Sequence, residues 1–192
     1  MYIILVDSRA ILRLLIQISL INLLSEEIIY MLRELNVSGK IFQLSRTMHL
    51  LKIPIIPKFL KQLNRIIFSC DIPYNTDIKN SVMFGHNGMG LVINKNAKID
   101  ENTLIMQHVT IGANMGKFRV VDGKKITAPY IGKNVLISAG AILLGPIVVG
   151  DNAQIGAGAV VTKDVPENGV AVGVPAKVVK VLNKNEIKEV LA

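Results

Sequence analysis

The sequence predicts a mainly β protein whose central part is a parallel β-helix of six-residue repeats. Three stretches show this period, because a large apolar residue recurs at every sixth position in each. The positions are Ile72, Ile78 and Phe84; Ile93, Ile99, Ile105 and Ile111; and Ile131, Ile137, Leu143, Val149, Ile155 and Val161. A period of six fits one short strand and one turn per repeat, with about eighteen residues in a three-sided coil. The helical period of 3.6 does not fit this spacing.

The residues beside the apolar positions also suit such a coil. A small residue often stands two places before the apolar one, as do Ala97 and Ala141, and glycine often follows it, as do Gly132 and Gly150. Small side chains fit next to a tight corner, and glycine tolerates a turn with positive φ. The apolar side chains are therefore expected to point inward and to stack from coil to coil.

Two interruptions of the repeat predict loops. Nine residues rather than six separate Phe84 from Ile93, and the extra length falls in the glycine-rich residues 85–90. Twenty residues separate Ile111 from Ile131, which predicts a loop of about fourteen additional residues. Loops that leave a rigid scaffold often carry functional sites.

A small α-helical region is expected before the β-helix, over residues 1–70. Residues 1–24 are strongly apolar, but Asp7, Arg9 and Arg13 leave no uncharged run long enough to span a membrane. The start also lacks the basic region and cleavage site of a secretory signal. We therefore expect an amphipathic or buried helix there.

Further helices are expected along the rest of this region. Ser25 resembles the N-cap of a helix over residues 28–35, which ends at residues 36–39. A second helix is expected over residues 41–53, because Pro54 and Pro57 would break it.

The helix expected from Lys58 onward has an amphipathic pattern. Its apolar positions are Phe59, Leu60, Leu63, Ile66 and Ile67. Its exposed face would hold Lys58, Lys61, Gln62 and Arg65. This face is either an ordinary solvated surface or one that contacts an anionic membrane.

The domain boundaries follow from these patterns. The β-helix is expected over residues 71–180, and residues 181–192 form a C-terminal tail. A short helix over residues 183–191 would cap the open end. The length of 192 residues suits one main domain with a smaller element.

Charge and cysteine content limit the function classes. The net charge of +8 suits an anionic ligand or an anionic membrane surface. Nucleic acid is disfavoured because the chain has no aromatic platform or known nucleic-acid motif. The single Cys70 excludes an internal disulfide and fits a reducing compartment, so we expect a cytoplasmic protein. We interpret Cys70 as a buried structural thiol rather than a nucleophile.

Several short motifs together resemble one enzyme family. They are DIP at 71–73, GHNGMGLVI at 85–93, QHVTIG at 107–112, ISAGA at 137–141, IGAGAVV at 155–161 and GVPAK at 173–177. These motifs, over roughly residues 70–180, resemble the serine O-acetyltransferase family. The repeat itself is shared by many acyltransferases, whereas the spaced Asp and His are more specific.

The resemblance implies a fold, an assembly and a donor. The β-helix would be left-handed and the protein a homotrimer or a higher oligomer, with acetyl-CoA bound in the groove between neighbouring subunits and no metal. Full-length members carry a larger helical domain, whereas the short helical region here resembles compact relatives linked to surface polysaccharide synthesis.

Asp71 and His86 match the family's catalytic Asp and His, which are fifteen residues apart. Histidine suits the removal of a hydroxyl proton near neutral pH. A carboxylate on the other ring nitrogen would fix the tautomer and stabilise the imidazolium. Because fifteen residues is just under one coil, the two side chains would lie on adjacent coils. We expect His86 to act as general base, Asp71 to orient it, and the small-molecule acceptor hydroxyl to attack the thioester directly.

The resemblance also implies a donor groove of small residues and exposed backbone amides. By this resemblance the groove is lined by Gly112, Ala113, Ala139, Gly140, Ala157 and Gly158. Lys163 and Lys177 are candidates for the CoA phosphates, and ordinary surface lysines are the alternative.

The acceptor is left open by two departures from the family pattern. Gly85 stands where serine enzymes have Asp, and Thr127 and Ala128 stand where they have an Arg-His pair. A serine carboxylate usually calls for a cation. Such a cation would have to come from the loop, from Lys124, Lys125 or Arg119. Serine and a sugar or surface-polysaccharide precursor therefore both stay candidates.

Two further functional classes fit the sequence less well. A zinc enzyme on a β-helix needs three His ligands, and only His49, His86 and His108 are present, with His49 in the helical region. A structural solenoid without activity is the other class, and the dyad spacing argues against it. His108 is interpreted as a corner histidine with no assigned role.

Overall fold

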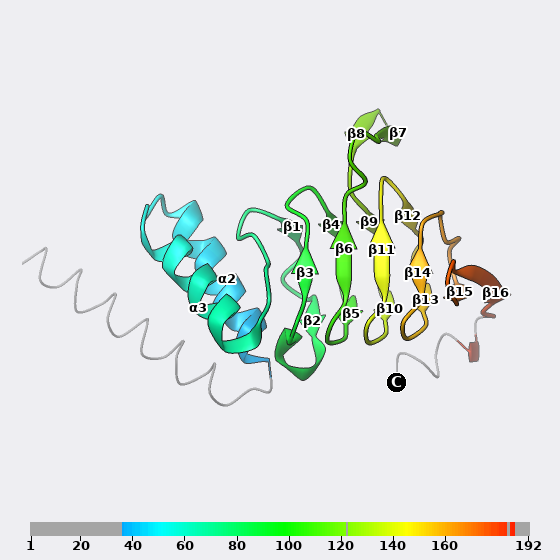
Figure 1. Cartoon of the computed structure of the whole chain (residues 1–192), viewed down its shortest axis with the longest axis horizontal. Helices are drawn as coiled ribbons and strands as arrows, with labels where there is room; N and C mark the ends of the chain where they lie inside the picture. Colours follow the sequence, from blue (N-terminus) through cyan, green and yellow to red (C-terminus); the bar gives the residue numbers. More distant parts are fainter. Residues whose placement is uncertain (1–35, 122, 184, 187–192) are drawn as a thin grey trace, which may run out of the picture.

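Residues 36–121, 123–183 and 185–186 are described by a computed structural model of the protein. The apolar segment 1–24 and the helix expected over 28–35 lie outside the described residues, as does most of the helix expected over 183–191. A pair of helices stands at one end of the described chain, and a three-sided coil of short strands follows it (Figure 1).

Three sheets form the sides of the coil, and their strands are parallel except for the last strand of the second sheet. The first sheet holds β1 (Asp77–Ile78), β4 (Lys98–Ile99), β9 (Tyr130–Ile131) and β12 (Val148–Val149). The second holds β2 (Met83–Phe84), β5 (Leu104–Ile105), β10 (Leu136–Ile137), β13 (Gln154–Ile155), β15 (Gly169–Val172) and β16 (Lys177–Val181). The third holds β3 (Val92–Ile93), β6 (Thr110–Gly112), β11 (Ile142–Leu144) and β14 (Val160–Val161). The predicted parallel β-helix is confirmed.

The strand register accounts for both interruptions of the repeat. Leu136 pairs with Gln154, eighteen residues on, which is one complete coil. Asp77 pairs with Lys98, twenty-one residues on, and Lys98 pairs with Tyr130, thirty-two residues on. These two separations exceed one coil of eighteen residues by three and by fourteen residues, which are the extra lengths of the short and the long loop. The coil therefore continues in phase on either side of each loop.

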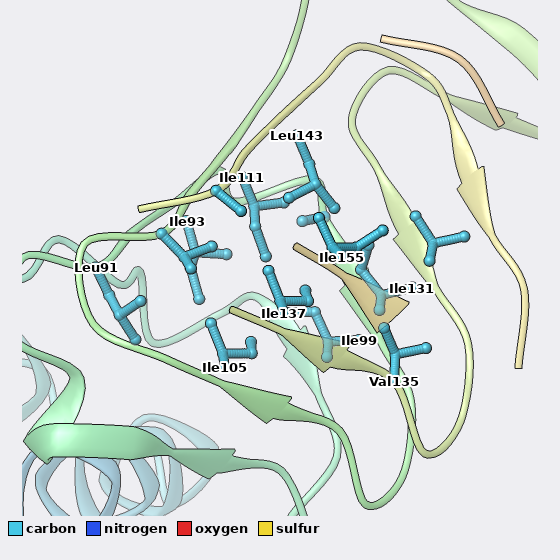
Figure 2. Packing of buried hydrophobic residues seen from close by; sticks show 14 of the residues in the cluster. Leu91, Ile93, Ile99, Ile105, Ile111, Ile131, Val135, Ile137, Leu143 and Ile155 are labelled. Carbon is cyan, nitrogen blue, oxygen red and sulfur yellow. The ribbon is translucent and has the colours of Figure 1, made fainter. Parts of the chain in front are cut away.

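The apolar positions of the repeat form the core. All thirteen are buried, each no more than 4% exposed. In register, Ile105 lies over Ile137 and Ile155, and Ile99 lies over Ile131 (Figure 2). Stacked aliphatic side chains therefore run the length of the coil, and each coil covers the core of the next.

The glycines that follow the inward positions, such as Gly132 and Gly150, do not have the positive φ expected of them. Asparagines at the corner between the first and second sheets have it instead. They are Asn102, Asn134, Asn152 and Asn168, all with positive φ. Their side-chain amides bond in a ladder, with Nδ2 to Oδ1 distances of 3.3, 3.1 and 2.9 Å. Asparagine tolerates this left-handed backbone and bonds locally. Each Asn precedes an inward position by three residues, a signal that was open to sequence reasoning.

Gly150 is predicted to be the most sensitive of the corner glycines that the structure describes. A Cβ built on Gly150 would lie 2.5 Å from the Glu167 backbone nitrogen and 2.8 Å from its Cα. Backbone cannot move aside cheaply, so Gly150→Ala should destabilise the fold by about 3 kcal/mol. Thermal or urea unfolding would measure this change. Gly116→Ala is the control: its Cβ would meet nothing within 4 Å, so only the cost of positive φ, about 1 kcal/mol, is expected. Equal destabilisation of both variants would contradict the steric explanation.

The first described helix, α2 (Val37–Leu50), starts and ends earlier than expected. Asn36 is its N-cap, with its side chain accepting a hydrogen bond from the Gly39 nitrogen at 3.1 Å. Residues 36–39, interpreted as a helix end, therefore begin a helix, because a capping Asn satisfies the free amides of a first turn.

The second helix, α3 (Ile56–Phe68), corrects two expectations. Pro57 lies in its first turn, where its missing N–H costs nothing, and so starts the helix rather than breaking the one before. The expected buried face is also wrong: Phe59, Ile66 and Ile67 are exposed. The helix instead turns Asn64 inward, where its amide donates to the Ser38 carbonyl at 3.1 Å.

The segments after the coil and in the long loop take forms the sequence did not predict. β16 returns antiparallel along β15 and closes the second sheet at the C-terminal end. The long loop carries an antiparallel pair, β7 (Arg119–Val121) and β8 (Lys124–Ile126), which projects from the coil (Figure 1). In the part of the chain that the structure describes, no helix is long and apolar enough to cross a membrane.

Candidate active site

His86 lies in the short loop between the second and third sheets, on the 3-10 turn η1 (Gly85–Gly88). The backbone of both His86 (φ 49°, ψ 43°) and Asn87 (φ 57°, ψ 25°) is left-handed. Asparagine tolerates this conformation, whereas for most other residues it costs about 1–2 kcal/mol. A residue such as His86 keeps it only where the surroundings hold it, and such strain is concentrated at functional sites.

The helical pair supplies part of what holds this loop. The Val37 backbone nitrogen, in the first turn of α2, donates to Asn87 Oδ1 at 2.8 Å. The side chain of Ser38 lies against Gly88, whose φ is +61° and where a Cβ would come within 3.3 Å of Ser38 Oγ. The imidazole of His86, by contrast, is exposed to solvent. The loop is thus fixed from behind while its histidine faces outward.

Both flanking glycines of the loop pack against the next coil. A Cβ on Gly85 would lie 2.6 Å from Met106 Sδ, and one on Gly90 would lie 2.3 Å from His108 Nδ1. Met106 thus fills the space where a side chain at position 85 would begin. Gly85, which stands where serine enzymes have Asp, is therefore accommodated by the side chain of Met106. His108 is a corner residue that packs on the loop.

Asp71 lies beside the third sheet, on the neighbouring coil. Its backbone bridges to Val92, six residues after His86. Its carboxylate is partly exposed and pairs with α3: Lys61 Nζ is 2.8 Å from Oδ1, and Arg65 Nη1 is 4.0 Å from Oδ2. Among the described residues, no hydrogen bond or ion pair joins Asp71 to His86. Catalytic hydrogen bonds are often long or unformed in a free enzyme and tighten in the substrate complex, so the geometry leaves both side chains as candidates.

The small residues assigned to the donor groove separate into two corners. Ala139, Gly140, Ala157 and Gly158 lie on the same corner as the His86 loop. Backbone bonds of 2.8–3.0 Å connect this corner coil by coil, from His108 N to Met89 O, from Gly140 N to Gln107 O and from Gly158 N to Ala139 O. Gly112 ends β6 and Ala113 follows it, at the opposite edge of the third sheet, where the Gly145 nitrogen donates to the Gly112 carbonyl at 2.9 Å.

The two candidate lysines for phosphate line one pocket. Lys163 and Lys177 border it with Pro175 and Ala176 near the C-terminal end of the coil. Neither makes an ion pair within the described residues. The arrangement offers two cations to one anionic group.

No three His, Cys, Asp or Glu side chains converge as metal ligands in the described part of the chain. His49, on α2, packs its ring on Tyr74 with the centroids 4.7 Å apart. The three histidines are therefore not gathered into one site there.

The chain was compared with known proteins. Residues 128–163 match the family described as bacterial transferase hexapeptide (six repeats). A serine acetyltransferase of Helicobacter pylori (strain J99) is 37% identical over 138 residues, which are 72% of this chain and 77% of the relative. The chain belongs to the serine acetyltransferase family.

Two further members give the extent of the match. The serine acetyltransferase of Synechococcus elongatus is 38% identical over 128 residues, 67% of this chain and half of that protein. A solved serine acetyltransferase in complex with CoA is 30% identical, with a TM-score of 0.62 over 74% of this chain and 55% of that one. The predicted left-handed β-helix is confirmed by this family membership, and the chain spans about half the length of these two relatives.

Relative to the serine acetyltransferase pattern, Thr127 and Ala128 serve structural roles. Thr127 Oγ1 accepts from Asn96 Nδ2 at 3.0 Å, and Ala128 is buried in the hydrophobic core of the coil. Of the three cations proposed to replace the missing pair, Arg119 is bound to Asp164 at 2.8 Å and Lys125 stacks on Phe118. Arg119 borders one pocket, whereas Lys124 lines a different one, at the base of the hairpin.

That pocket contains a polar group that sequence reasoning missed. The Lys98 ammonium donates to the Tyr130 hydroxyl, which donates to Asp100 Oδ2, each at 3.0 Å. The hydrogen bond with Tyr130 raises the pKa of Lys98, with Asp100 adding to the effect. Lys98 precedes the inward position Ile99, and Tyr130 precedes the inward position Ile131 on the next coil. Aligning the repeats after removal of the long loop would therefore have placed Lys98 against Tyr130.

Cys70 is buried directly behind the site, as the sequence predicted. It is 1% exposed, with Sγ 3.6 Å from Ser38 Oγ and 3.5 Å from the Asn64 carbonyl. Burial raises the pKa of this thiol. The group links both helices to the start of the coil.

Cys70 is therefore expected to be inert in the folded protein. Ellman's reagent should not react with it during a few minutes at pH 8, and should titrate one thiol per chain once guanidinium unfolds the protein. The rate of colour development measures this directly. Fast reaction of the native protein would contradict a buried thiol.

Proposed function

We propose that the protein is an acetyl-CoA-dependent O-acetyltransferase of the serine acetyltransferase type. The proposal rests above all on His86, an exposed histidine held in a strained loop that belongs to a coil of this family. The whole relatives are named for acetyl transfer to serine, and one solved relative holds CoA.

In the proposed reaction His86 removes the proton of the acceptor hydroxyl as the oxygen attacks the thioester carbonyl. The oxyanion that forms collapses, the C–S bond breaks, and the proton held by His86 passes to the departing CoA sulfur. Asp71 stabilises the imidazolium formed in between. Backbone amides that do not bond between coils are candidate donors to the oxyanion.

The donor is proposed to lie along the small-residue corners. Ala139, Gly140, Ala157 and Gly158 would accept the narrow pantetheine arm close to the backbone, and Lys163 and Lys177 would pair with phosphate. Gly112 and Ala113 lie on the other edge of the same sheet, so one copy alone does not gather all six. A groove between two copies, with one corner from each, would do so, which supports the homotrimer.

Light scattering tests this assembly. A mass of three chains would support the proposed trimer, and a stable active monomer would overturn it. The division into residues 1–70, 71–180 and 181–192, the cytoplasmic location and peripheral membrane contact through residues 1–70 stay predictions.

The acceptor separates two forms of the proposal. Serine is supported by the relatives' names. A sugar or surface-polysaccharide precursor is favoured by the site, where Gly85 is backed by Met106 and where Thr127 and Ala128 carry no charge.

Thiol release from acetyl-CoA decides between them. Initial rates would be measured with L-serine, with a panel of monosaccharides and with no acceptor. Serine-dependent release supports the serine form, and release only with a sugar supports the second form. If no acceptor stimulates release and CoA does not bind, the acetyltransferase proposal fails.

A further inference from the structure

An apolar surface is exposed along α3 and the turn before it. We call it the apolar stripe, and it consists of Leu51, Ile55, Ile56, Phe59, Ile66 and Ile67. Ile55, Phe59 and Ile66 are 75%, 64% and 71% exposed. Soluble proteins rarely leave so many large apolar side chains together in water, so the stripe marks a contact surface.

The helical period explains why the stripe is separate from the packed face. Pro57 and Asn64, seven residues apart, turn toward α2 and are buried. Ile56, Phe59 and Ile66 fall on another side, which the described chain leaves uncovered. α3 therefore has an apolar side beyond what its own fold uses, along about 20 Å of helix.

The charge of the same helical pair indicates what covers the stripe. Residues 36–70 contain six Lys or Arg and no Asp or Glu. Lys58 and Arg65 lie seven residues apart on one side of α3, and Lys52 is in the turn. Lys52 and Lys58 are exposed and make no ion pair within the described residues. The stripe thus calls for a partner that is both apolar and negatively charged.

We propose that the α2–α3 pair docks on an anionic lipid membrane, with the apolar stripe in the interface and the cations against lipid headgroups. A helix with apolar and cationic sides binds in this way. A second copy of the pair would bring six further cations and no acid, which disfavours a symmetric contact. Residues 1–35, which precede the pair, carry three Arg and four Asp or Glu, so their net charge of −1 leaves most of the pair's charge of +6 unbalanced.

The docking surface is joined to the candidate active site. Lys61 of α3 binds Asp71 at 2.8 Å, and Val37 of α2 binds Asn87 beside His86 at 2.8 Å. A membrane-bound helical pair would therefore hold the His86 loop near the lipid surface. This inference does not depend on the acceptor, because it concerns a surface outside the catalytic residues.

Vesicle sedimentation of the full-length protein tests the proposal. The probes are vesicles of phosphatidylcholine alone and of phosphatidylcholine with one quarter phosphatidylglycerol. We expect binding to the anionic vesicles at least about tenfold tighter than to the neutral ones, and weakened by 0.5 M salt. Lys58→Gln should weaken it about fivefold.

The double variant Phe59→Asp/Ile66→Asp should lower binding to anionic vesicles at least about tenfold. Met115→Asp/Val120→Asp is the matched control, because it places the same two charges at exposed apolar positions of the loop and should bind like wild type. Circular dichroism establishes whether each variant is folded. If the double variant is unfolded, the weaker binding expected of Lys58→Gln still tests the proposal.

Three outcomes would overturn the proposal. Absence of binding to anionic vesicles would do so. Unchanged binding by the stripe variant would place the membrane contact elsewhere, as in residues 1–24. In the third, the wild type binds no vesicles and the stripe variant changes its oligomeric state or melts at a lower temperature. The stripe would then be covered by a second copy or by another segment of the same chain.

Discussion

Replacing His86 with asparagine is expected to lower kcat for acetyl transfer by about 10²–10⁴-fold, the usual contribution of a general base. Asparagine is the suitable replacement because it tolerates the left-handed backbone at this position (φ 49°) and cannot take a proton at neutral pH. The loop should therefore keep its shape while the base is lost. Steady-state thiol release, with whichever acceptor the wild type uses, measures the effect.

His108 offers a matched control for this prediction. It lies on the same corner, is also exposed, and has the same left-handed backbone with φ of 59°. Its ring packs on Gly90 of the loop. His108→Asn should lower kcat less than about tenfold, since corner packing alone is altered. If both variants lose activity equally with unchanged melting temperatures, His86 is not the base.

The β-helix was predictable because its signal is redundant. A single inward residue such as Ile137 does not predict a fold. Thirteen apolar residues that recur with a period of six predict the sheets, their register and the core together. The loops could be located for the same reason, since a break in phase is visible only against a strict period. Their internal form could not, because the β7–β8 hairpin has no repeat of its own.

The helical region was harder to predict because a helical pattern fixes spacing but not direction. The apolar positions of α3 are spaced as expected, yet Phe59 and Ile66 face outward. A buried polar contact from Asn64 to Ser38 decides the orientation, and such a contact depends on a partner helix. A similar limit applies to the site: the spacing identified Asp71 and His86, whereas the cation that binds Asp71 comes from α3.

The pairing of Asp71 with Lys61 leads to the second large effect. Lys61 occupies Oδ1 at 2.8 Å, while among the described residues Oδ2 is paired only with Arg65, at 4.0 Å. Oδ2 is thus the oxygen left to accept the imidazole N–H of His86 when substrate is bound. Asp71→Asn removes the negative charge that would stabilise the imidazolium, and kcat should fall about 10²–10⁴-fold. KM for acetyl-CoA should change little, because Asp71 does not lie on the small-residue corners.

Lys61→Met separates the two roles of Asp71. It removes the ion pair but leaves the carboxylate, so a loss of kcat below about tenfold is expected, with a small loss of stability for a partly exposed pair. Kinetics and thermal unfolding of both variants would be measured side by side. If Asp71 only anchors α3, the two variants should lose stability and activity together and by similar amounts. If only Asp71→Asn loses much of its kcat, and its melting temperature is unchanged, the carboxylate acts on His86 rather than as an anchor for α3.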